Sequence, residues 1–118
     1  MSDIKITNTD LEHIVHHFIT AANRFDTQAV LDLFAADAVI EDVSVGERFE
    51  HSAGIKKYFV TFFIGYHTST RLLSLKHTGP GKILAKVDFT GDFGHETGGL
   101  AVRVNEAGLI EHVDAYLD

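Results

Sequence analysis

The spacing of apolar residues changes once along this 118-residue chain, and the change limits the folds that it can adopt. In the first half, apolar residues recur at intervals of three and four, the spacing of one buried helix face; they are Leu11, Ile14, Val15, Phe18, Ala22 and Phe25. After Thr68 the interval becomes two, as in Ile83, Ala85, Val87 and Phe89, which is typical of half-buried strands. Helices followed by strands predict an α+β fold rather than a βαβ alternation.

Three helices and five strands are expected. A capping box at Thr9–Glu12 would open the first helix, Asp26 would cap the second, and Ser52 would cap the third. The strands are expected at residues 38–43, 69–77, 82–90, 95–105 and 109–117, with glycine-containing turns between the last four. No linker or repeat divides the sequence, so residues 1–118 are expected to form a single domain.

The composition argues against several classes of protein. There are no cysteines, so disulfides and thiol nucleophiles are excluded. The net charge is −7 and the only basic pair is Lys56-Lys57, so no nucleic-acid partner is expected. The chain shows no signal-peptide pattern and no apolar run long enough to span a membrane, so we expect a cytoplasmic protein without a membrane partner.

Four segments together carry a resemblance to a known family: residues 18–26 (FITAANRFD), 33–42 (LFAADAVIED), 54–59 (GIKKYF) and 105–114 (NEAGLIEHVD). They resemble the NTF2-like superfamily, and within it the ketosteroid isomerase and SnoaL-like polyketide cyclase families. The resemblance implies a cone-shaped α+β barrel in which three N-terminal helices pack on a curved, mostly antiparallel sheet. It also implies an apolar small-molecule ligand and a homodimer, whose outer sheet face would carry Leu73, Leu84 and Tyr116.

The resemblance places Asp42 at the position of the isomerase general base. The positions of that family's two tyrosines and its protonated aspartate are occupied here by Phe18, Phe59 and Leu100. Removing one oxyanion donor typically costs about 100–1000-fold in rate, so the standard steroid isomerase reaction is not expected.

Asp42 is the first catalytic candidate, because a carboxylate on an apolar wall is suited to general-base work. The alternative is a structural role, with Asp42 at the mouth of the cone capping a loop amide. The expected lining of the pocket is Phe18, Ile40, Phe59, Phe63, His67, Val87, Leu100 and Val102. Tyr58 is expected at an interface or exposed, because it neighbours Phe59 and points elsewhere on the helix.

Asp114 is the second catalytic candidate. It alternates with His112 and Tyr116 on one face of the last strand, whereas the other face is apolar. The apolar face favours an outward position for Asp114, although a slip of one residue would exchange the faces. His13 and His17 have the spacing of a metal pair but no third ligand at motif spacing, so neither a metal nor another cofactor is expected.

Two functions remain open. The first is a proton-transfer enzyme of the isomerase, cyclase or dehydratase type, acting on an apolar carbonyl compound with Asp42 as base. Its electrophilic partner would be His67, a bound water or the His112/Asp114 pair. The second is a non-catalytic ligand-binding or dimerisation module, which an apolar cone without an oxyanion hole also suits.

Overall fold

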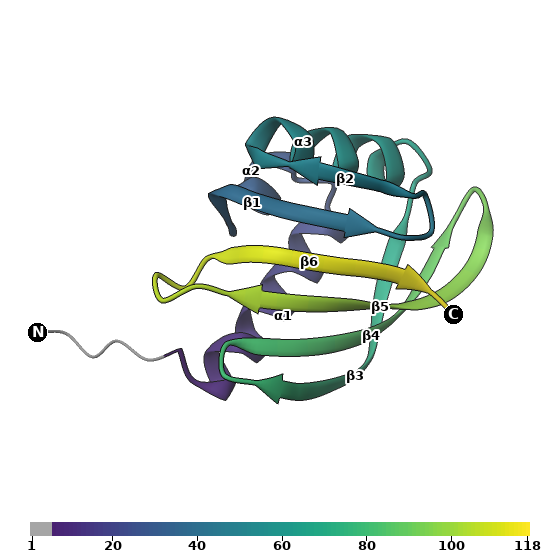
Figure 1. Cartoon of the computed structure of the whole chain (residues 1–118). Helices are drawn as coiled ribbons and strands as arrows, with labels where there is room; N and C mark the ends of the chain where they lie inside the picture. Colours follow the sequence, from purple (N-terminus) through teal and green to yellow (C-terminus); the bar gives the residue numbers. More distant parts are fainter. Residues whose placement is uncertain (1–5) are drawn as a thin grey trace, which may run out of the picture.

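The computed structural model describes residues 6–118 as a curved sheet with helices on one of its faces (Figure 1). The helices are α1 (Asn8–Asn23), α2 (Thr27–Leu31) and α3 (His51–Phe59), and α3 continues into a π-helical turn, η1 (Val60–Ile64). The strands are β1 (Phe34–Asp42), β2 (Glu47–Glu50), β3 (Ser69–Gly79), β4 (Lys82–Gly91), β5 (Gly94–Val104) and β6 (Ile110–Leu117). The predicted α+β class is confirmed, and the sheet is curved but does not close into a barrel.

The six strands lie in the order β2-β1-β6-β5-β4-β3. Strands β3 to β6 are joined by antiparallel hairpins, and β1 pairs with β2 in the same way. The exception is the parallel pairing of β1 with β6, in which Ile40 lies opposite Val113 and Asp42 opposite Ala115. Because these two strands run the same way, their C-terminal ends meet at one end of the sheet, and Asp42 is there.

The core fills the space between the concave face of the sheet and the helices. In Figure 1, α1 crosses behind the sheet and α3 lies at its β1–β2 end. The buried residues of the two long helices are Leu11, Val15, Ala21, Ala22, Ile55, Tyr58 and Phe59. The buried apolar residues of β4 and β5 recur at intervals of two, as predicted, and those of β6 do so from Val113 on, after a register shift near its start. They are Ile83, Ala85, Val87, Leu100, Val102, Val104, Ile110, Val113 and Ala115.

The helix starts differ in part from the prediction. Helix α1 begins two residues early: the Thr7 hydroxyl accepts from the Asp10 amide at 3.1 Å, and the Asp10 carboxylate accepts from the Thr7 amide at 3.0 Å. The box predicted at Thr9 was therefore wrong in register, because both threonines have an acid three residues on. Asp26 caps α2 as predicted, accepting from the Ala29 amide at 3.1 Å.

Strand β2 was not predicted, and it explains the start of α3. It is only four residues long, with Phe49 as its one buried side chain, so alternation could not reveal it. The chain passes directly from β2 into α3 through Glu50, which makes no side-chain cap bond. The predicted Ser52 cap was wrong, since Ser52 already lies inside the helix.

Among residues 6–118, none of the helices combines the length and the hydrophobicity that a membrane-spanning helix needs.

Candidate functional site

A cavity of about 340 Å³ opens at the end of the sheet where β1 and β6 finish. We call it the open cavity. Its wall comes from the end of β1, from α3 and η1, from the β4–β5 hairpin and from the end of β6, and it consists of Asp42, Ser44, Val45, Tyr58, Phe62, Phe63, Tyr66, Thr68, Phe89, Phe93, Glu96 and Leu117. The volume is in the range of small-molecule sites. Half of the wall residues are aromatic, and apolar and aromatic side chains with some polar groups are the usual lining of such sites.

Asp42 lies in this wall with 7% of its surface exposed. Its Oδ1 accepts hydrogen bonds from the Ser44 amide, at 2.9 Å, and from the Ser44 hydroxyl. Its Oδ2 accepts one from the Tyr58 hydroxyl. Three donors supply the partners that a buried carboxylate needs, because an unpaired charge in such a place would be strongly destabilising.

Tyr58 is buried, with 7% of its surface exposed, so the predicted exposed or interfacial position is wrong. Phe59 faces the core, but the neighbouring side of α3 is also covered, by the aromatic rings of Phe49 and Phe62 at centroid distances of 4.9 and 5.2 Å. Burial first, and then the nearby Asp42 carboxylate, raise the pKa of Tyr58 well above its ordinary value. The hydroxyl therefore stays protonated at neutral pH and acts as a hydrogen-bond donor.

A second cavity, the closed cavity, lies deeper and measures about 20 Å³. Five of the predicted pocket residues line it: Phe18, Ile40, Phe63, Leu100 and Val102. Tyr58 and Phe63 line both cavities, so these two rings separate the open cavity from the closed one. Apart from the Tyr58 hydroxyl, the side chains around the closed cavity are apolar, so the chemistry available to a ligand is in the open cavity.

The other three predicted lining residues lie elsewhere. Phe59 and Val87 are buried in the core but border neither cavity. His67 also borders neither, and 74% of its side chain is exposed. Its backbone has a positive φ of 54° in the turn after η1, and its ring pairs with Asp92 at 2.9 Å. This turn geometry directs His67 away from the cavity, which helical spacing alone could not show.

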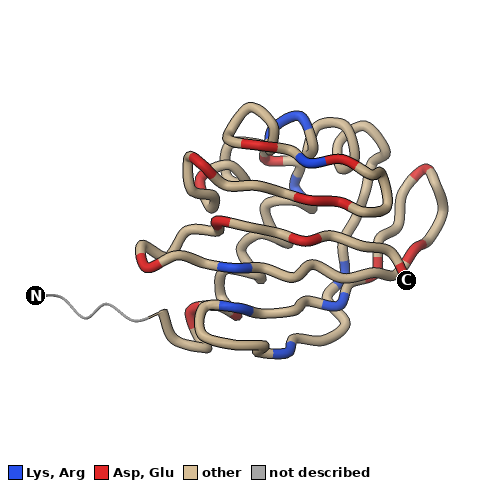
Figure 2. The backbone as a smooth tube through the Cα atoms, in the orientation of Figure 1, with Lys and Arg blue, Asp and Glu red and all other residues tan. Residues whose placement is uncertain are grey.

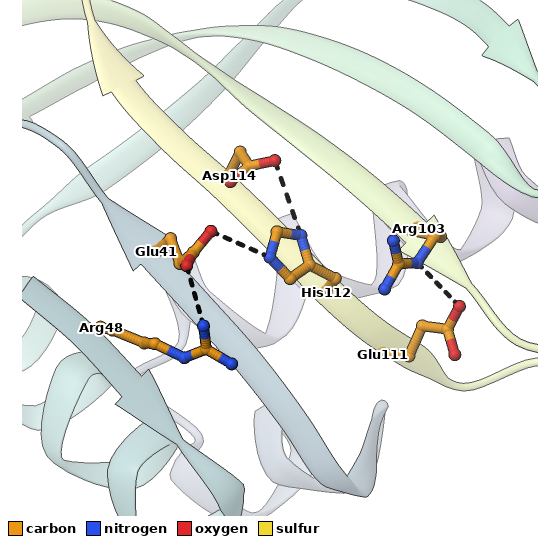
Figure 3. A network of polar contacts seen from close by, with 6 residues as sticks. All are labelled: Glu41, Arg48, Arg103, Glu111, His112 and Asp114. Carbon is orange, nitrogen blue, oxygen red and sulfur yellow. Dashed lines mark hydrogen bonds and ion pairs between the residues drawn. The ribbon is translucent and has the colours of Figure 1, made fainter.

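Asp114 lies on the outer face of the sheet, with 59% of its side chain exposed (Figure 3). In the parallel register it is opposite Glu41, the neighbour of Asp42, and successive strand residues point to opposite faces. His112 lies between the two acids, 3.2 Å from Glu41 and 3.6 Å from Asp114. Asp114 and Asp42 are therefore on opposite sides of the sheet, and the structure does not bring them together.

Glu41, His112 and Asp114 also form the one group within residues 6–118 whose arrangement could hold a metal ion, with ligand atoms within 4.8 Å of one another. Glu41 is already paired with Arg48 at 3.2 Å (Figure 3). A cation bound there would compete with that guanidinium and would lie outside both cavities. His13 and His17 stack at a centroid distance of 6.4 Å without an acidic third member.

Five polar residues of the open cavity were not among the predicted site residues: Ser44, Tyr58, Tyr66, Thr68 and Glu96. Tyr58 and Tyr66, with Phe62 between them, follow one another at intervals of four, which is a signal for one helix face. Glu96 has the same strand parity as Leu100 and Val102, so alternation places it on the inner face. Ser44 lies in the loop after β1 and carries no periodic signal.

Helices packed on a curved open sheet, with an aromatic cavity and a buried carboxylate at its end, define the NTF2-like class of pocket protein. The chain belongs to the SnoaL-like domain family, whose model matches residues 15–114. The search of curated proteins found no match.

Solved structures with this fold include a candidate ketosteroid isomerase from Kribbella flavida, with 15% identity, a TM-score of 0.84, and coverage of 97% of this chain and 81% of that one. A candidate polyketide cyclase from Sinorhizobium meliloti has 25% identity and a TM-score of 0.81, with coverage of 92% and 98%. RV0760c from Mycobacterium tuberculosis, solved with estradiol-17β-hemisuccinate, has 21% identity and a TM-score of 0.81, with coverage of 92% and 94%.

Proposed function

We propose that this protein binds an apolar carbonyl compound in the open cavity and catalyses proton transfer at the carbon beside the carbonyl. The reaction would be of the isomerase, cyclase or dehydratase type, with Asp42 as the general base. One observation carries the proposal: a buried carboxylate opens onto a cavity whose wall is otherwise mostly aromatic. That combination gives a base a dry site next to an apolar ligand, where electrostatic interactions are stronger than in water.

In the proposed step, Asp42 accepts a proton from the carbon acid and the electron pair moves to the carbonyl oxygen. The developing oxyanion needs a donor, and Phe18 and Leu100 provide none. The protonated Tyr58 hydroxyl, already bonded to Asp42, is in the same wall and can supply it. As the proton moves to Asp42, the carboxylate loses its charge and its hydrogen bond from Tyr58 weakens, so the hydroxyl turns toward the substrate oxygen while the negative charge develops there. A single donor of this kind is typically worth about 100–1000-fold in rate.

Hydrogen–deuterium exchange tests the proposal without knowledge of the natural substrate. The probe is 2-tetralone, a compact aromatic ketone whose acidic carbon is next to the carbonyl, and its exchange in D₂O is followed by proton NMR. Wild-type protein should accelerate the exchange, and Asp42→Asn should reduce the protein-dependent rate by at least about 100-fold. Asp37→Asn is the matched control, because Asp37 is an exposed aspartate on the same strand. Equal rates for wild type and Asp42→Asn would rule out Asp42 as the base.

A second candidate is ligand binding without turnover. It is favoured by the Ser44 contacts, since an aspartate that accepts from the amide two residues on is also a common structural element of a turn. Binding of 2-tetralone, seen as chemical-shift changes at the open cavity, without any protein-dependent exchange would favour this function. A cytoplasmic location and a homodimer are compatible with either function. The homodimer would form through the outer sheet face, with Leu73, Leu84 and Tyr116, and sedimentation at micromolar concentration would test it.

A further inference from the structure

We propose that Glu96 selects the ligands of the open cavity by their charge. The cavity takes aromatic or alicyclic compounds that are neutral or carry a protonated amine, and it rejects carboxylates such as keto acids. This inference rests on the proposed function because it concerns the same cavity. It adds the class of substrate and the residue that determines it.

The wall of the open cavity has negative charge and no positive charge. Its two ionisable acids are Asp42 and Glu96, and none of its residues is a lysine, arginine or histidine. Figure 2 shows acidic positions and no basic one in the outer part of the β4–β5 hairpin, where residues 89–97 include Asp92 and Glu96 but neither lysine nor arginine. In a protein with a net charge of −7, this end of the sheet attracts cations and repels anions.

Three basic residues on strands β3, β4 and β5 are engaged with other acids. Arg71 pairs with Asp88 at 3.1 Å, and Lys86 pairs with Asp118 at 2.8 Å. His95 also approaches Asp88, at 2.7 Å. None of these three residues borders the open cavity, so none is placed to neutralise an anionic ligand there.

The two carboxylates of the cavity differ in whether their oxygens already accept hydrogen bonds from the protein. Asp42 already accepts from Ser44 and Tyr58. Glu96 is exposed at the rim of the cavity, opposite Phe89 in the β4–β5 pairing, and among residues 6–118 its carboxylate has no hydrogen-bond or ion-pair partner. Its carboxylate is therefore available to a donor group on a ligand. The rings of Tyr66 and Phe93 line the same cavity, and aromatic faces attract a cation through their negative quadrupole.

Three probes with one shape and three charges test the proposal: 2-naphthylmethylamine, 2-naphthalenemethanol and 2-naphthoate. Dissociation constants are measured at pH 7 by titration calorimetry and mapped by NMR shifts. For wild type, the ammonium should bind about tenfold more tightly than the carboxylate, as expected for one partly exposed charge pair and an aromatic wall. Glu96→Gln should reduce this ratio by about fivefold, and so should high salt.

Glu106→Gln is the matched control. It removes the same charge from an exposed glutamate in the turn at the other end of β5, so the ratio should change by less than about twofold. If the alcohol binds in the open cavity but Glu96→Gln leaves the ratio unchanged, the charge selection is wrong and the proposed function stands. If no probe binds, the open cavity is not a ligand site, and the proposed function and this inference are both wrong.

Discussion

The hydroxyl of Tyr58 donates a hydrogen bond to Oδ2 of Asp42, and this bond connects helix α3 to the last residue of strand β1. Both side chains are buried, and both border the open cavity. The pair therefore has two functions in one contact: it fixes the helix against the end of the strand, and it places an acceptor and a donor side by side in the wall of the cavity.

Removing either partner of this pair should destabilise the fold. Tyr58→Phe leaves a buried carboxylate with one donor fewer, and hydrogen bonds to charged groups contribute about 1.5–3 kcal/mol. Asp42→Asn should have a cost of similar size, since it weakens the bonds from Ser44 as well. Because the two mutations remove the same contact, the double variant should lose less than the sum, with a coupling of about 1–2 kcal/mol in urea unfolding. Strictly additive losses would contradict the bond.

The stability of the protein should fall at alkaline pH because of Tyr58. The folded-state pKa of Tyr58 is raised above its unfolded value of about 10, so folding favours the neutral hydroxyl. This contribution is fully present below the unfolded pKa and is lost as the pH rises through the folded one. The difference in unfolding free energy between wild type and Tyr58→Phe should therefore shrink above about pH 10. Other tyrosines and lysines titrate in both proteins, so a difference that stays constant up to high pH would contradict the shift.

The start of α1 gives a pair of variants that decides between two registers of the capping box. The Asp10 carboxylate accepts from the Thr7 amide, and this bond, with the Thr7 hydroxyl, lowers the pKa of Asp10. Thr7→Ala should lower the melting temperature by several degrees, because the cap is lost. Thr9 lies inside the helix, so Thr9→Ala should have little effect on the melting temperature. The reverse order in thermal melts would support the box at Thr9.

Asp114→Asn should leave the proposed exchange reaction unchanged. Asp114 lies on the outer face of the sheet beside His112, whereas the open cavity is on the inner side. The rate of 2-tetralone exchange for Asp114→Asn should therefore match that of wild type within about twofold, against a loss of at least about 100-fold for Asp42→Asn. A tenfold fall in Asp114→Asn, in a protein with unchanged stability, would show that Asp114 acts on the reaction.

Two neighbouring glycines of β5 should respond differently to alanine. A Cβ on Gly98 would collide with the backbone carbonyl of Tyr116, whereas a Cβ on Gly99 would collide with the end of the Tyr116 ring. A half-exposed ring can rotate away, but a backbone carbonyl within a sheet cannot. Gly98→Ala should therefore destabilise the protein by about 2 kcal/mol or more, and Gly99→Ala by clearly less. Equal losses in urea unfolding would contradict this account of the β5–β6 contact.

Much of the fold could be predicted because it depends on patterns within single segments. The four strands after Thr68 begin within one residue and end within two of their predicted bounds, since alternation of burial is a local property of a strand. Strand β2 was missed because four residues carry too little alternation. The first capping box was displaced because Thr7 and Thr9 offer the same local chemistry, and only the actual start of the helix distinguishes them.

Less of the candidate site could be predicted, because the site depends on which parts of the chain pack against each helix and strand. The position of Asp42 came from resemblance to a family, but its donors did not. Tyr58 was assigned to an exposed side of α3 because Phe59 faces the core, yet both sides of that helix are covered in the fold. Periodicity shows which residues share a face, but it does not show whether another part of the chain packs against the opposite face.

The rings of Tyr58 and Phe63 form a partition between the open and the closed cavity. The size of these two side chains therefore affects how long a ligand the protein could hold. The closed cavity behind these rings has room for about one water molecule, so the depth of the open cavity is limited by the two rings and by the apolar side chains packed behind them. A smaller residue at position 63 would join the two compartments and let a longer ligand reach Phe18 and Leu100. The cavity would then deepen by about the volume of the side chain removed, while the sheet and helices keep their places.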